Sequence, residues 1–118
     1  MPTKADHKAK AEHNEYFVST LGNPFFDWQA TALFYSALQY IQAYFVAKGV
    51  NPPPTSHTMR NNHVSADSKL TNIYVDYREL QDESRTARYG CGFPTQTDIT
   101  RLQANLATIK ALVMPDIV

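Results

Sequence analysis

Apolar side chains recur at spacings of three and four residues along most of this chain, which is the period of an amphipathic helix. The clearest case lies near the end of the chain, where Thr95 precedes Asp98 by three residues, the pattern of a reciprocal N-terminal cap. We therefore predict a helix over Gln96–Val113. Its apolar positions are Ile99, Leu102, Leu106, Ile109 and Val113.

Two further segments show the same period, and neither shows the alternation of a β-strand. The pattern over Lys4–Leu21 predicts a modestly amphipathic helix whose apolar residues lie toward its C-terminal end. The pattern over Ser68–Tyr89 predicts a longer helix with one continuous stripe of residues along one face. That stripe consists of Leu70, Ile73, Tyr74, Tyr77, Leu80, Ser84 and Arg88.

The segment Pro24–Lys48 predicts a helix with two unlike faces. One face is aromatic and aliphatic, and the other carries small residues and amides, including Ser36 and Gln39. Asn23 provides an amide cap and Pro24 suits the first helical position. A helix with so few charged positions is expected to be buried on both sides, so we predict that it is the central helix.

Glycine and proline cluster at residues 22–24, 49–54 and 90–94, and these breaks cut the chain into four helical pieces. The pattern predicts an all-α fold, an up-and-down four-helix bundle, formed by residues 1–118 as a single domain. Residues 57–67 are polar, and their pattern leaves open a short helix or a loop.

Composition narrows the classes of function. The chain has 11 Lys and Arg residues and 11 Asp and Glu residues, so its formal net charge is zero. A chain without net charge has no long-range attraction to nucleic acid. A local basic site is still compatible with this composition. The single cysteine, Cys91, excludes an intrachain disulfide and fits a reducing compartment. Polar residues interrupt the most apolar stretch, residues 30–47. We expect a soluble, cytoplasmic protein with no membrane span and no signal peptide.

The strongest candidate for a ligand site is the end of the Ser68–Tyr89 helix. Ser84 and Arg88 continue the apolar line that passes through Tyr77, and Arg85 and Tyr89 form a second pair on the flank. The two arginines are suited to hold a phosphate or carboxylate. The alternative is that Arg88 pairs internally with an acid or a helix C-terminus. In either case the Arg88 guanidinium, which is in line with the core residues of this helix, requires an anionic or carbonyl partner.

Ser36 and Gln39 have two interpretations. They line the same site or face a second subunit, or they serve packing, because small residues let helices approach closely and a buried amide satisfies a neighbouring backbone group. Something must cover the Gln39 face, either the rest of the bundle or a second subunit, and we predict a homodimer.

No residue pattern supports catalysis, a metal or a cofactor. His57 and His63 lie six residues apart, on different helical faces, and Cys91 has no second cysteine at a metal-binding spacing. No glycine-rich phosphate loop is present in the sequence. We assign no catalytic residue, no metal ligand and no cofactor.

Two segments resemble the HEPN superfamily. Residues 23–49, NPFFDWQATALFYSALQYIQAYFVAKG, are similar to its second helix, and residues 70–89, LTNIYVDYRELQDESRTARY, are similar to its third. The resemblance implies a four-helix bundle that commonly dimerises. It also implies a prokaryotic toxin–antitoxin, defence or mobile-element system, with a nucleotide or RNA ligand, or a nucleotidyltransferase or antitoxin as partner.

The ribonuclease members of that superfamily carry an Arg followed, after four to six residues, by a His. Here no histidine follows Arg85 or Arg88, and Arg60 precedes His63 by only three positions. We therefore expect a non-catalytic binding or partner module. One rival is a divergent metal-independent RNase that uses His57 or His63 across a dimer interface. The other is a structural homodimeric adaptor without a small ligand.

Overall fold

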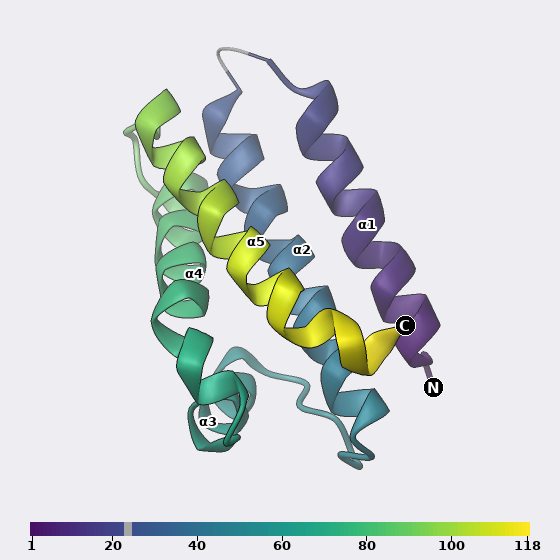
Figure 1. Cartoon of the computed structure of the whole chain (residues 1–118). Helices are drawn as coiled ribbons and strands as arrows, with labels where there is room; N and C mark the ends of the chain where they lie inside the picture. Colours follow the sequence, from purple (N-terminus) through teal and green to yellow (C-terminus); the bar gives the residue numbers. More distant parts are fainter. Residues whose placement is uncertain (23–24) are drawn as a thin grey trace.

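The computed structural model describes residues 1–22 and 25–118, and within them the protein is built from helices and contains no strand (Figure 1). The expected Asn23–Pro24 start lies outside the described residues. No helix among them has the length and apolar character that crossing a bilayer requires. The elements are α1 (Lys4–Thr20), α2 (Phe26–Ala47), α3 (His57–Ala66), the 3-10 turn η1 (Leu70–Ile73), α4 (Tyr74–Tyr89) and α5 (Gln96–Ile117).

The helix α2 is the central element, as the sequence predicts. It packs against α1, α4 and α5, and Figure 1 shows α5 crossing in front of it. Its apolar side chains, among them Phe34, Ile41 and Phe45, are buried. Full burial of one such side chain stabilises the fold by roughly 1.5–3 kcal/mol. The helix ends where Gly49 takes a positive φ of 77°, a conformation that glycine adopts without strain.

The polar stretch after the prolines forms a helix rather than a loop. The Ser56 hydroxyl accepts a hydrogen bond from the Met59 amide at 3.1 Å and caps the start of α3. Val64 is buried, and the His63 ring packs edge-on against Phe45 with 5.6 Å between centroids. The Ser cap was readable in the sequence, but so few apolar residues follow it that periodicity could not identify the helix.

The predicted helix over Ser68–Tyr89 is wrong at its first turn. The Asp67 side chain accepts hydrogen bonds from the amides of Lys69 and Leu70, both at 2.9 Å, and from the Tyr44 hydroxyl at 3.1 Å. These bonds fix the chain in the 3-10 turn η1 before α4 begins at Tyr74. The apolar stripe is nevertheless continuous, since Leu70, Ile73, Tyr77, Leu80 and Ser84 are all buried.

The last helix runs beyond its predicted end at Val113 to Ile117, in spite of Pro115. A proline near a helix end removes one hydrogen bond. The end is held because Ile117 is buried and Asp116 pairs with Lys48 at 3.0 Å and Lys69 at 2.6 Å. At the other end, the predicted reciprocal cap is confirmed by bonds of 2.8 and 3.2 Å that join Thr95 and Asp98.

Candidate functional site

Arg88 lies at the end of the α4 stripe, half-buried at the rim of the bundle. Its Nη1 donates to the Ser84 hydroxyl at 2.9 Å and to the Tyr35 hydroxyl at 3.0 Å. The guanidinium also lies 5.4 Å from the ring centroids of Tyr35 and Tyr89. Hydroxyls and rings thus take the place of the expected anionic or carbonyl partner, and the guanidinium reaches the surface.

These residues border a cleft of about 420 Å³, within the range of roughly 300–1,000 Å³ that is usual for small-molecule sites. The start of α3 forms one wall, α4 from Arg78 to its end forms the other, and α2 contributes one tyrosine. The lining residues are Tyr35, His57, Thr58, Asn61, Arg78, Gln81, Asp82, Arg85, Arg88 and Tyr89.

A buried arginine lies beside the cleft on α3. The Arg60 side chain is only 6% exposed, and its Nη1 is 3.5 Å from Nδ1 of His57, which lines the cleft. Its other partners are neutral oxygens: Oε1 of Gln42 at 3.0 Å and the carbonyl of Pro54 at 3.5 Å. A buried cation is usually paired with an acid, so Arg60 contributes uncompensated positive charge to this region.

The arginines of the cleft are also largely unpaired. Arg78 pairs with Asp82 at 3.6 Å, whereas Arg60, Arg85 and Arg88 form no ion pair with any described residue. Three guanidinium groups therefore line the cleft and that of Arg60 lies beside it, whereas among the described residues the lining contains one carboxylate, that of Asp82. The chain carries no net charge, and the excess positive charge here is therefore local.

Polar atoms without hydrogen-bond partners concentrate in the same place. Buried polar groups are nearly always hydrogen-bonded, and each exception calls for an explanation. Within the described part of the chain six buried side-chain atoms have none, and all but the amide nitrogen of Asn105 belong to the cleft or its floor. These five are Oδ1 of Asn61, the hydroxyl of Tyr77, Nε of Arg78, Oε1 of Gln81 and Nε of Arg88.

The titratable groups reflect the buried, positive surroundings. Burial raises the pKa of the Tyr77 hydroxyl to about 12, against the opposing effect of Arg60 and Arg78. Burial, together with the charges of Arg60 and Arg88, lowers the pKa of His57 below its ordinary value. A bound anion would reverse the effect of these charges on His57.

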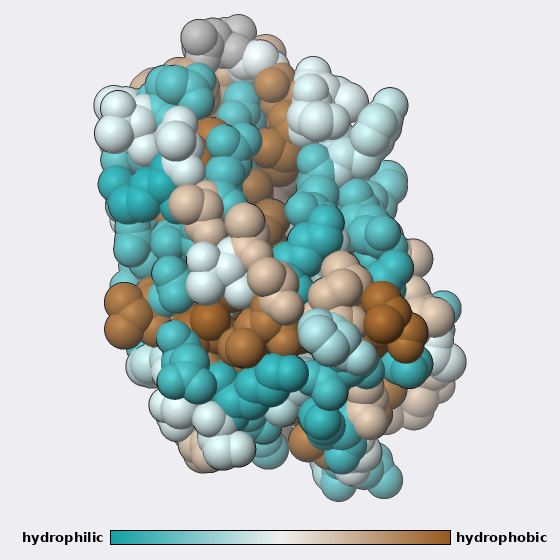
Figure 2. Space-filling view, in the orientation of Figure 1, coloured by the Kyte–Doolittle hydropathy of each residue, from teal (hydrophilic) through white to brown (hydrophobic). Residues whose placement is uncertain are grey.

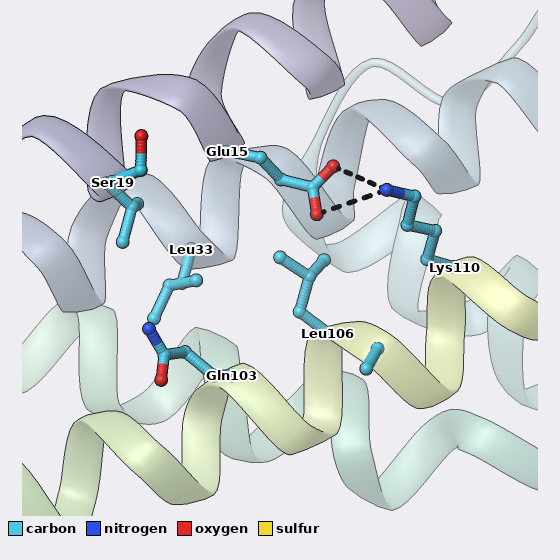
Figure 3. Close-up of a pocket in the computed structure, with 8 residues that line it drawn as sticks. Glu15, Ser19, Leu33, Gln103, Leu106 and Lys110 are labelled. Atoms are coloured by element: carbon cyan, nitrogen blue, oxygen red, sulfur yellow. Dashed lines mark hydrogen bonds and ion pairs between the residues drawn. The ribbon is translucent and has the colours of Figure 1, made fainter.

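A second hollow, of about 370 Å³, lies between α1 and α5. Figure 2 shows apolar surface at its floor, and Figure 3 shows Glu15 and Lys110 facing each other across it. The Lys110 ammonium is 3.1 Å from the Glu15 carboxylate, which also accepts a hydrogen bond from the buried Tyr40 hydroxyl. These polar groups satisfy one another and join the helices, so the two charges of this hollow are already paired.

The structure brings most of the predicted site residues together. Arg85, Arg88 and Tyr89 line the cleft, Ser84 orients Arg88, and Tyr77 lies beneath. Ser36 and Gln39 lie outside it. The Ser36 hydroxyl donates to the Ala11 carbonyl of α1 at 2.9 Å, and Oε1 of Gln39 is 2.7 Å from Nδ1 of His7.

Sequence reasoning missed the α3 wall and the tyrosine of α2. His57, Arg60 and Asn61 recur at helical spacing after the Ser56 cap, which is the one signal that could have revealed them. Tyr35 lies among aromatic residues of α2 that the sequence assigns to the core or to its small face. Its exposure depends on where α1 and α4 stop covering α2, and no local pattern encodes that.

Comparisons of the chain with models of protein families, with curated proteins and with solved structures give no match. The likeness to the HEPN superfamily therefore rests on the two segments quoted above. Within the described residues, no three His, Cys, Asp or Glu side chains are grouped as metal ligands would be.

Proposed function

We propose that this protein is a HEPN-like, non-catalytic binding module whose cleft holds a phosphate-bearing ligand, a nucleotide or the phosphate of an RNA. The observation that carries the proposal is the convergence of Arg60, Arg85 and Arg88 without ion pairs, beside polar atoms that lack partners. A guanidinium binds phosphate through two parallel hydrogen bonds, and the loss of such a partner from a buried cation is costly.

The roles of the cleft residues follow from their positions. Arg85 is exposed on the α4 flank and is suited to meet the phosphate first. Arg88 is held by Ser84 and Tyr35, and its Nε remains without a partner. The Tyr89 ring is 80% exposed and offers a flat face on which a base can stack.

One observation favours the rival ribonuclease hypothesis, since His57 lines the same cleft as Arg88. Cleavage needs both a proton acceptor and a proton donor. His57 is the single histidine that lines the cleft in the described part of the chain, and His63 packs against Phe45 elsewhere. We therefore favour binding over hydrolysis. An adaptor with no small ligand would leave the unpaired arginines without a role.

The arrangement of the protein and its partners belong to the same proposal. We propose that α1, α2, α4 and α5 form a HEPN-like up-and-down four-helix bundle with α3 as an addition, in a cytoplasmic protein. A nucleotidyltransferase or antitoxin is the class of partner that the resemblance suggests. The homodimer stays a prediction, which light scattering at high micromolar concentration tests.

Titration calorimetry with pyrophosphate and with AMP tests the proposal. The native chain should bind both, and Arg85→Ala should weaken binding at least about fivefold, because an exposed arginine without an ion pair contributes mainly to the ligand. Lys4→Ala, which removes an exposed cation on another helix, serves as the control and should leave the affinity unchanged. Absence of binding to the native chain, or equal losses in both variants, would contradict the proposal.

A further inference from the structure

The central helix α2 is left open on one side. α1 packs on α2 and α4 packs on α2, but over the described residues α1 and α4 do not contact each other. Along this open side the α2 residues recur at helical spacing: Trp28, Thr31, Ala32, Tyr35 and Gln39. The opposite side of α2 is covered by α5 (Figure 1).

Two hollows make this open side a continuous groove. One, of about 340 Å³, lies between α1 and α2, and the other, of about 250 Å³, lies between α2 and α4. They share Trp28 and Thr31. The groove meets the cleft between α3 and α4 at Tyr35 and Arg88 but extends away from it along α2.

The groove is lined by large aromatic side chains that remain exposed. Trp28 is 56% exposed, Phe17 of α1 is 45% exposed and Tyr35 is 36% exposed. Single exposed aromatics are ordinary, but several that line one concave surface are typical of an interaction site.

The charge at the edges of the groove is mainly positive. Lys10 lines its α1 side and Arg88 its α4 side, and neither forms an ion pair with a described residue. Among the described residues, Asp27 is the one acid that lines the two hollows. The complementary partner therefore carries negative charge next to an apolar surface.

We propose that this groove docks an amphipathic helix of another protein, with an apolar stripe on Phe17, Trp28 and Tyr35 and acidic residues toward Lys10 and Arg88. A helix fits because the site lies on one helix between two others, the position that a further helix of a bundle occupies. A second copy of this chain fits less well, since it would bring its own Lys10 and Arg88 to the same positive edges; the predicted homodimer would then use a face other than this one. The proposal does not depend on the cleft between α3 and α4.

The native chain contains its own reporter, because Trp28 is its single tryptophan. Two synthetic 18-residue peptides, roughly 27 Å long as helices, serve as probes. Both carry leucine at spacings of three and four residues. The remaining positions are glutamate in one peptide and lysine in the other. We expect the glutamate peptide to shift Trp28 emission to shorter wavelength and to bind about tenfold more tightly than the lysine peptide.

Matched variants locate the binding. Phe17→Ala and Lys10→Glu should each weaken the glutamate peptide about fivefold or more, the scale of an interface anchor. Tyr16→Ala and Lys4→Glu, exposed positions on α1 that do not line the groove, should not change it. The proposal would be overturned by equal binding of both peptides or by binding that is insensitive to Phe17→Ala. It would also be overturned if oligouridylate bound at Trp28 more tightly than the glutamate peptide, or if Trp28 emission shifted with protein concentration because a second copy binds there.

Discussion

Replacement of Arg88 by alanine separates an internal role of this arginine from a role in ligand binding. In the folded protein its bonds go to two neutral hydroxyls, those of Ser84 and Tyr35. No described carboxylate pairs with it. The Arg88→Ala variant therefore strands no buried acid, which is the event that makes the loss of a paired arginine severe.

The expected loss of stability is small. The two bonds run from a charged guanidinium to neutral hydroxyls. Such a bond contributes about 1.5–3 kcal/mol where it is buried but less at the surface, which Arg88 reaches. The exposed Tyr35 hydroxyl regains water, and the buried Ser84 hydroxyl can turn to a carbonyl of its own helix. We expect Arg88→Ala to lower the free energy of unfolding by about 1 kcal/mol, or Tm by about 3–5 °C for a domain of this size.

The expected loss of binding is larger. A hydrogen bond to a charged group contributes about 1.5–3 kcal/mol, which corresponds to about 10–150-fold in Kd. Thermal melts of both proteins, with and without AMP, measure the two effects together. A destabilisation above about 3 kcal/mol with unchanged AMP binding would place the partner of Arg88 inside the fold. No change in either quantity would refute the charge argument.

Three further predictions follow from the structure. Thr95→Ala removes the α5 cap and should lower the free energy of unfolding by about 1 kcal/mol in a denaturant titration, while Thr97→Ala should have little effect. Because the pKa of His57 is lowered in the folded protein, the unfolded chain binds more protons just below the ordinary imidazole pKa of about 6.5. Stability should therefore fall as pH decreases through that window, and the fall should be smaller in His57→Gln. The purified protein should not cleave RNA; cleavage that disappears in His57→Ala or His63→Ala would reverse the non-catalytic assignment.

The long helices could be predicted because their information is local. The apolar stripe of α4, the Thr95 cap and the mixed faces of α2 each lie within one segment, and the helical period places their residues. Boundaries were less predictable. η1 depends on Asp67 bonding to the chain that follows it, and the extension of α5 past Pro115 depends on lysines from elsewhere in the fold.

The candidate site was predictable only on the α4 side. One helix carries Arg85, Arg88 and Tyr89, and their spacing in the sequence predicts that they lie close together. In the structure all three line the cleft. The opposite wall required a tertiary arrangement, because α3 carries His57 and Arg60 to that helix from a polar segment with little periodicity. That Arg60 forms no ion pair with any described residue could not be predicted from a chain whose charges balance overall.

Amide chemical-shift mapping is the sharpest test of whether the cleft between α3 and α4 holds a phosphate-bearing ligand. AMP is titrated into the isotope-labelled native chain, with adenosine as the control that lacks the phosphate. We expect AMP to shift the amides of the cleft residues, and adenosine at equal concentration to shift them far less. These residues are His57, Asn61, Arg85, Arg88 and Tyr89. Shifts confined to the hollow between α1 and α5, equal shifts with adenosine, or no shifts at millimolar AMP would contradict the proposal.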